Sequence, residues 1–184
     1  MVVAEPLQGL VLVSGPSRGG KSRWAEHLVS QHHPVSYVAT SDPRPDDSGW
    51  QERLRLHRER RPSTWDVIES GADLSHALSR IPRDHSVLVD ALGAFTAWHL
   101  DANSMEWAQL EADLIKTLQD RERPVVLVIE ETGWGVVPAT AIGGRFRDRQ
   151  GRLAHQLEHI ASASWLVVQG RALDLHALGA AVPD

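Results

Sequence analysis

The residues best suited to chemistry lie in one glycine-rich segment near the N-terminus. An apolar run, Val11–Val13, leads directly into the sequence GPSRGGKS at positions 15–22. This segment matches G-x-x-x-x-G-K-[ST], the phosphate-binding loop of nucleotide-using proteins. Its glycines let the backbone curl so that successive N–H groups point at phosphate oxygens. Lys21 adds a positive charge for the outer phosphates, and the hydroxyl of Ser22 can ligate Mg²⁺.

The surroundings of this segment fit the same interpretation, because a strand should precede the loop and a helix should follow it. The stretch Ser22–His32 lacks glycine and proline and carries apolar residues at helical spacing. The N-terminus of that helix would direct the positive end of its dipole at the bound phosphates. We therefore predict a triphosphate-binding loop rather than a chance glycine-rich turn.

Composition limits the class of protein. The chain has 184 residues, of which 42% are hydrophobic, so residues 1–184 are expected to form a single globular domain. The formal net charge of −5 argues against a nucleic-acid partner. The absence of cysteine excludes disulfides, thiolate metal sites and cysteine nucleophiles. No basic leader and no apolar run near the ~20 residues of a membrane span are visible, so we expect a cytoplasmic protein.

Apolar, β-branched runs alternate with segments of helical periodicity, which is typical of an α/β fold. Such a fold has a mostly parallel sheet with helices on both faces. Strands are predicted at Leu10–Ser14, Val35–Ala39, Asp66–Glu69, Val87–Asp90, Val125–Glu130 and Trp165–Gln169. Helices are predicted at Ser22–His32, Trp50–Arg60, Leu74–Ile81, Met105–Arg121 and Arg145–Ala161, and a flexible loop at Asp42–Gly49. Ligands of these sheets bind beyond the carboxyl ends of the strands, where we expect the loops to converge.

Two further residues could act at this edge of the sheet. Asp90 ends the apolar run VLVD, which is the Walker-B-type position whose carboxylate helps to hold Mg²⁺; alternatively, Asp90 caps the next helix. His57 lies in the basic sequence RLRLHRERRP. The pattern alone favours a solvated helix face. Yet a histidine among arginines also suits nucleophilic attack on a phosphate, because the arginines neutralise the incoming charge.

The sequence HQLEH at positions 155–159 matches the H-x-x-E-H motif of inverted zinc peptidases. Those enzymes need a further carboxylate ligand later in the chain, usually Glu. No glutamate follows His159. We therefore expect His155 and His159 to lie on a helix face rather than to bind zinc.

Taken in order, these motifs resemble the bifunctional adenosylcobinamide kinase / adenosylcobinamide-phosphate guanylyltransferase family of cobalamin biosynthesis. The matching segments are Val13–Glu26, Tyr37–Ser41, Arg53–Trp65, Glu69, Val87–Asp90, Glu131–Pro138 and Arg145–Leu153. The resemblance implies a P-loop NTPase fold with a RecA-like sheet and assembly into a homotrimer. It also implies two reactions. ATP or GTP phosphorylates adenosylcobinamide, and GTP then donates GMP to adenosylcobinamide phosphate through a guanylyl-histidine.

The resemblance also assigns residues. His57 falls on the guanylylated histidine, while Ser22 and Asp90 remain the Mg²⁺ ligands that the motifs predict. The nucleotide contacts of the family fall on Gly15, Pro16, Ser17, Arg18, Gly19, Gly20, Lys21, Ser22, Ala39, Thr40, Ser41, Arg58, Glu59, Arg60, Arg61, Glu69 and Asp90. Two departures stand out. Some members have two adjacent histidines where this chain has Leu56 and His57, and some carry Glu in place of Asp90.

The residues leave two other interpretations open. One is a P-loop kinase of a small molecule that performs no guanylyl transfer, and guanylylation of His57 separates it from the first interpretation. The other is a nucleotide-gated, RecA-like ATPase or switch whose output is a conformational change. Stimulation of triphosphate consumption by cobinamide would distinguish an enzyme from such a switch.

Overall fold

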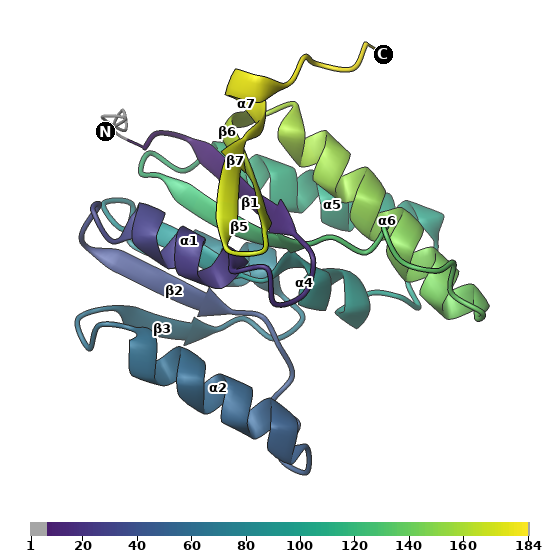
Figure 1. Cartoon of the computed structure of the whole chain (residues 1–184), viewed down its shortest axis with the longest axis horizontal. Coiled ribbons are helices and arrows are strands. Elements are labelled where there is room, and N and C mark those ends of the chain that lie inside the picture. Colours follow the sequence, from purple (N-terminus) through teal and green to yellow (C-terminus); the bar gives the residue numbers. More distant parts are fainter. Residues whose placement is uncertain (1–6, 184) are drawn as a thin grey trace.

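The computed structural model describes residues 7–183, which build one seven-stranded sheet in the order β3-β2-β4-β5-β1-β6-β7 (Figure 1). Neighbouring strands run parallel, except that β6 and β7 are antiparallel. The strands are β1 (Leu10–Gly15), β2 (Val35–Ala39), β3 (Asp66–Glu69), β4 (Ser86–Asp90), β5 (Val125–Glu130), β6 (Ala161–Val168) and β7 (Arg171–Asp174). Strand β5 therefore separates β1, which leads into the glycine-rich loop, from β4, which ends at Asp90.

Most of the helices begin where the sequence supplies a hydrogen-bonding cap. They are α1 (Lys21–Val29), α2 (Ser48–Arg60), α3 (Leu74–Ser79), α4 (Leu92–Trp98), α5 (Ser104–Gln119), α6 (Ala141–Glu158) and α7 (Leu175–Leu178). The side chain of Asp47 caps α2, and Thr140 caps α6. Asn103 and Glu106 form a reciprocal capping box at the start of α5.

Alternating side chains of the strands point to opposite faces of the sheet, and each face has its own hydrophobic core. On β1, Leu10 and Leu12 join a core with the apolar residues of α3, α4, α5 and α6. Val11 and Val13 point to the other face and pack with Ala25 of α1. The central strands β1, β2, β4 and β5 are therefore buried on both sides, as near-continuous apolar runs predict. The expected α/β fold, with a mostly parallel sheet and helices on both faces, is confirmed.

The structure differs from the sequence-based prediction at several boundaries. Strand β6 begins at Ala161, so the preceding helix ends at Glu158 instead of continuing to Ala161. The end of the predicted loop Asp42–Gly49 belongs to α2, because Asp47 accepts a hydrogen bond from the N–H of Trp50. Three short elements, α4, β7 and α7, were not predicted, because their few residues show little periodicity. Within residues 7–183, no helix is long and apolar enough to cross a membrane.

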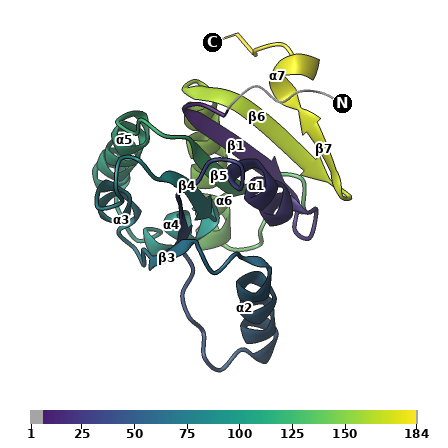
Figure 2. The same cartoon turned by 90° about the vertical axis from the view of Figure 1, so that its left-hand side faces the viewer.

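Helix α2 stands beyond the edge of the sheet, as Figure 2 shows. None of its side chains that the structure describes is fully buried. Polar contacts hold it instead. Arg60 forms an ion pair with Glu26 of α1 at 3.1 Å, and the guanidinium of Arg61, just after the helix, lies 4.1 Å from the ring centroid of Tyr37. Electrostatic contacts therefore hold α2, the helix that carries His57, against the rest of the fold.

Candidate active site

The glycine-rich loop is preformed, and its glycines are required by close packing. Gly15 and Gly20 adopt φ angles of 145° and 109°, and Arg18 between them adopts 59°. A Cβ atom on Gly15 would collide with the carbonyl oxygen of Val167, and one on Gly19 would lie 2.6 Å from that oxygen. The end of β6 therefore presses against the loop and fixes its curl. Only glycine fits at these two positions.

Lys21 begins α1 and points back into the loop. Its side chain is buried, and its Nζ donates a hydrogen bond to the carbonyl oxygen of Pro16 at 2.9 Å. The N-cap of α1 is Gly20, which offers no side chain to the first turn. No capping side chain therefore competes with an anionic ligand at this helix N-terminus, as in other phosphate-binding loops.

Asp90 is the polar centre of the site. The hydroxyl of Tyr37 donates to its Oδ2 at 3.0 Å, and Nδ1 of His57 lies 3.6 Å from the same oxygen. The side chain of Ser22 also interacts favourably with this carboxylate. Burial alone would raise the pKa of Asp90, but these three side chains outweigh burial, so the pKa is lowered. Asp90 therefore stays ionised next to the glycine-rich loop.

The two interpretations of Asp90 are now distinguishable by position. Helix α4 follows Asp90, but its N-cap is Ala91, and no side chain caps it. The carboxylate of Asp90 instead interacts with Ser22 of α1, next to the glycine-rich loop. Its location thus favours the Walker-B-type role over helix capping.

Arg61 connects α2, the helix that carries His57, to Tyr37 of β2. Its Nε donates to the carbonyl oxygen of His57 at 3.1 Å, while its guanidinium covers the ring of Tyr37. Its Nη1 is buried and has no hydrogen-bond partner among the residues that the structure describes. A buried guanidinium nitrogen without a partner is costly, and an anionic ligand would satisfy it.

These residues surround a cavity of about 1000 Å³ at the carboxyl edge of the sheet. The residues assigned to nucleotide or catalysis that line it are Ser17, Arg18, Gly20, Lys21, Ser22, Ala39, Thr40, Ser41, His57, Arg60, Arg61 and Asp90. Gly15, Pro16 and Gly19 complete the loop behind this lining. The remaining assigned residues lie outside it: Arg58, Glu59 and Glu69 are exposed. Glu59 pairs with Arg55 on the same helix.

Thr40 lies in the lining, but its hydroxyl is used inside the fold. It donates to the carbonyl oxygen of Ala91 at 2.6 Å and accepts from the N–H of Ala91 at 2.9 Å. The carbonyl oxygen of Thr40 accepts from Nε1 of Trp98 at 3.2 Å. Thr40 thus fixes the backbone immediately after Asp90, and we infer a positioning role for its side chain.

Thr40→Val is expected to destabilise the protein by about 1–3 kcal/mol, because it keeps the shape but leaves the N–H of Ala91 without its partner and removes one of the two hydrogen bonds to the carbonyl oxygen of Ala91. Urea unfolding measures this change. Thr40→Ser, which retains the hydroxyl, is the matched control and should lose much less. A stability of Thr40→Val equal to that of the wild type would show that the two hydrogen bonds contribute nothing net.

Glu130 is a site residue that the sequence did not single out. It ends β5 between the loop strand and the Asp90 strand, and its Oε2 accepts from the N–H of Gly93 at 2.8 Å. Burial raises the pKa of Glu130, and the hydrogen bond from Gly93 offsets only part of that effect. From the sequence, the position of Glu130 at the end of a predicted strand was the feature that could have indicated a site residue. Tyr37, in contrast, lies within an apolar strand, and only its place in the matching segment Tyr37–Ser41 pointed to the site.

The site contains oxygen donors of the kind that bind a magnesium ion. The carboxylate of Asp90 and the hydroxyl of Ser22 are neighbouring oxygen donors, and Mg²⁺ typically takes one or two protein oxygens and completes its shell with water and phosphate. Among residues 7–183, no group of three or more histidine or acidic side chains is arranged to hold a metal by itself. His155 lies on α6, His159 caps its C-terminus, and their ring centroids are 4.8 Å apart.

Comparison with known proteins now gives the family. A family model described as CobU, cobinamide kinase / cobinamide phosphate guanyltransferase, matches residues 11–175. The chain belongs to this family. The resemblance that the motifs indicated is therefore confirmed, and the protein is an enzyme of the cobinamide kinase and guanyltransferase class.

Three curated relatives are named bifunctional adenosylcobalamin biosynthesis proteins. The bifunctional adenosylcobalamin biosynthesis protein CobU of Escherichia coli K12 is 33% identical over 177 residues, which is 88% of this chain and 96% of that protein. CobU of Salmonella typhimurium LT2 is 31% identical over 176 residues, with the same coverage. CobP of Pseudomonas aeruginosa PAO1 is 34% identical over 148 residues, or 79% and 84% of the two chains.

A solved structure from Pyrococcus horikoshii OT3 superimposes with a TM-score of 0.52 at 9% identity. It covers 91% of this chain and 85% of that one. At this identity the likeness concerns the fold alone.

Proposed function

We propose that the protein phosphorylates adenosylcobinamide and then transfers GMP from GTP to adenosylcobinamide phosphate, through a guanylyl group on His57. The product is adenosylcobinamide-GDP. The observation that carries this proposal is the position of His57, whose Nδ1 lies 3.6 Å from Asp90 in the cavity that holds the glycine-rich loop. A kinase that performs no guanylyl transfer needs no imidazole there, so this feature favours the bifunctional enzyme.

In the kinase reaction, the loop amides and Lys21 bind the triphosphate of ATP or GTP. Ser22 and Asp90 would hold Mg²⁺, which when bound neutralises charge on the phosphate oxygens. The hydroxyl of the aminopropanol arm attacks the γ-phosphorus, and the nucleoside diphosphate leaves. Lys21 offsets the charge that develops on the transferred group and on the leaving group.

In the guanylyl reaction, His57 is the nucleophile. Asp90 lies next to Nδ1 and favours a proton on that nitrogen, which leaves the lone pair of Nε2 for attack on the α-phosphorus of GTP. A P–N bond forms and pyrophosphate leaves. An oxygen of adenosylcobinamide phosphate then attacks the same phosphorus, the P–N bond breaks, and His57 is regenerated.

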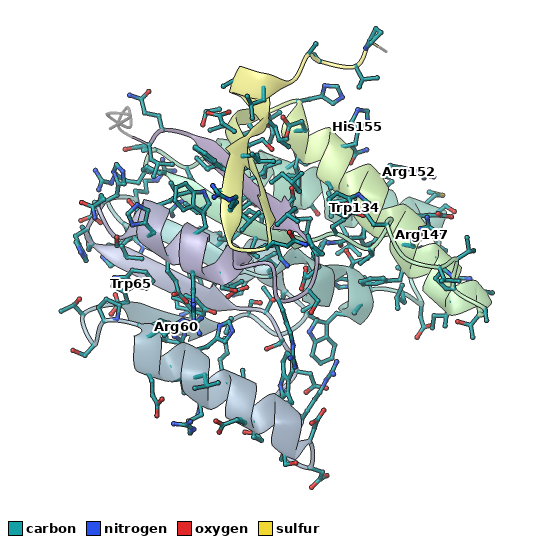
Figure 3. The ribbon with its side chains drawn as sticks, in the orientation of Figure 1. Arg60, Trp65, Trp134, Arg147, Arg152 and His155 are labelled. Atoms are coloured by element: carbon teal, nitrogen blue, oxygen red, sulfur yellow. The ribbon has the colours of Figure 1, made fainter. Side chains whose placement is uncertain are left out.

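The resemblance further supports a homotrimer, and we include that assembly in the proposal. The loop between β5 and α6 exposes Trp134, Val136 and Val137 at 62%, 95% and 70% of their surface, and contiguous exposed apolar residues are typical of subunit contacts. Figure 3 shows Trp134 beside Arg147 of α6. The cytoplasm is the proposed location, because ATP and GTP are available there. No nucleic-acid partner is proposed for a chain of net charge −5.

A labelling and chase experiment tests the proposed function. Incubation with α-labelled GTP should leave label on the protein that is labile to acid and stable to alkali, as a phosphoramidate is. Addition of adenosylcobinamide phosphate should move that label into adenosylcobinamide-GDP. Kinase activity without protein-bound label would support a simple P-loop kinase. Triphosphate hydrolysis that corrinoids do not stimulate would support a nucleotide-gated switch.

A further inference from the structure

One side of the cavity is apolar, although the phosphate-binding side is charged. We call this side the apolar wall, and its residues are Leu54 of α2, Ala94, Ala97 and Trp98 of α4, and Phe146 of α6. Helices α4 and α6 pack on the face of the sheet opposite to α1. The members of the apolar wall on α4 and α6 therefore lie across the sheet edge from the helix that follows the phosphate loop.

Trp98 is the largest member of the apolar wall, and its orientation is fixed. Its Nε1 donates to the carbonyl oxygen of Thr40 at 3.2 Å, yet 44% of the residue remains exposed. The indole is thus held by its polar edge while much of its apolar surface faces the cavity. An exposed aromatic face inside a cleft is a typical ligand contact.

The chemistry of the apolar wall argues against the guanine base as its ligand. Selective binding of guanine needs hydrogen-bonding groups that meet the edge of the base. Four members of the wall have hydrocarbon side chains, and the single polar atom, Nε1 of Trp98, is already bonded to Thr40. The apolar wall is suited to a ligand that is recognised by a broad apolar surface.

We propose that the apolar wall binds the corrin ring of the acceptor, with Trp98 packed against the macrocycle. This inference rests on the proposed function. Both reactions act on the same aminopropanol arm, so the ring must lie where that arm reaches Lys21 and His57, and both residues line the cavity that the wall closes. Trp98 would thereby select for a large, flat acceptor in both half-reactions.

The test compares Trp98→Ala with Trp98→Phe. The alanine variant is expected to raise the KM for adenosylcobinamide in the kinase reaction, and for its phosphate in GMP transfer, by about 5- to 100-fold, as for the loss of an aromatic stack. The phenylalanine variant retains a ring and should recover most of the loss. The KM for GTP in self-guanylylation, measured without any corrinoid, should change much less in both. Met105→Ala, at an 84% exposed apolar residue on α5, is the matched control.

A second variant tests the same wall by filling it. Ala97 is exposed on α4, so Ala97→Trp adds bulk to the cavity without disturbing the core, and it should also raise the KM for the acceptor. An unchanged acceptor KM in Trp98→Ala and Ala97→Trp overturns the inference. A rise confined to the KM for GTP assigns the wall to the nucleoside and also overturns it. An altered oligomeric state with unchanged acceptor KM assigns the wall to a second copy. If the wild type forms no guanylyl-protein, the proposed function itself fails.

Discussion

Replacement of His57 by alanine is expected to abolish protein-bound GMP and to leave the phosphorylation of adenosylcobinamide largely intact. His57 supplies the only nitrogen nucleophile that the described residues place beside Asp90. Loss of a covalent nucleophile typically costs on the order of 10⁴-fold or more in rate. The phosphate loop lies on another element and keeps its own contacts. Label from α-labelled GTP and release of nucleoside diphosphate measure the two reactions separately.

His76→Ala is the matched control for this variant. His76 is exposed on α3 and does not line the cavity, so its removal should change neither reaction. Labelling of His57→Ala at the wild-type level would contradict the assignment of the nucleophile. A loss of both activities in His57→Ala would instead show that His57 supports the whole site, for instance through Asp90.

Replacement of Lys21 by alanine is expected to impair both reactions together. Lys21 is buried at the start of α1, and its Nζ already lies within the loop, 2.9 Å from the carbonyl oxygen of Pro16. Such a preorganised charge stabilises developing negative charge without rearrangement, and removal of one such donor costs about 10²- to 10³-fold in kcat. The kinase rate and the rate of self-guanylylation should therefore both fall, because each uses the same triphosphate cradle.

The chain has one other lysine, Lys116, which is exposed on α5 and provides the matched control. Lys116→Ala should retain both activities. If Lys21→Ala lost only one activity, the two reactions would use different phosphate sites. Full kinase activity in Lys21→Ala would remove the glycine-rich loop from the mechanism.

The strands and long helices were predictable because each has a local cause. Buried parallel strands must be apolar on both faces, so Val35–Ala39 and Val125–Glu130 were predicted with the bounds that the structure has. Strand β7 was not, because RALD is short and pairs with β6 only through tertiary contact. The end of α6 was set too late, since β6 begins where the sequence still permits a helix.

The site was predictable where a motif encodes its geometry. The glycine-rich loop, Asp90 and His57 follow from sequence, and the structure places them around one cavity. The contacts of Tyr37, Glu130 and Trp98 could not be predicted, because they depend on how distant segments meet. The sequence places Tyr37 in a buried strand, and the role of its hydroxyl becomes visible only when the structure shows its hydrogen bond to Asp90. The engaged hydroxyl of Thr40 is likewise visible only once Ala91 is placed.

The ion pair between Arg60 and Glu26 has a consequence for how tightly nucleotides are retained. Arg60, which Figure 3 labels, is one of the residues that line the cavity, yet two of its nitrogens already donate to the carboxylate of Glu26, at 3.2 and 3.1 Å. A phosphate that approaches Arg60 competes with Glu26 for the same positive charge, so the exchange of one counter-anion for the other gains little free energy. Such an exchange favours rapid departure of pyrophosphate and spent nucleotide, which suits a catalyst that must empty its site twice in each complete cycle.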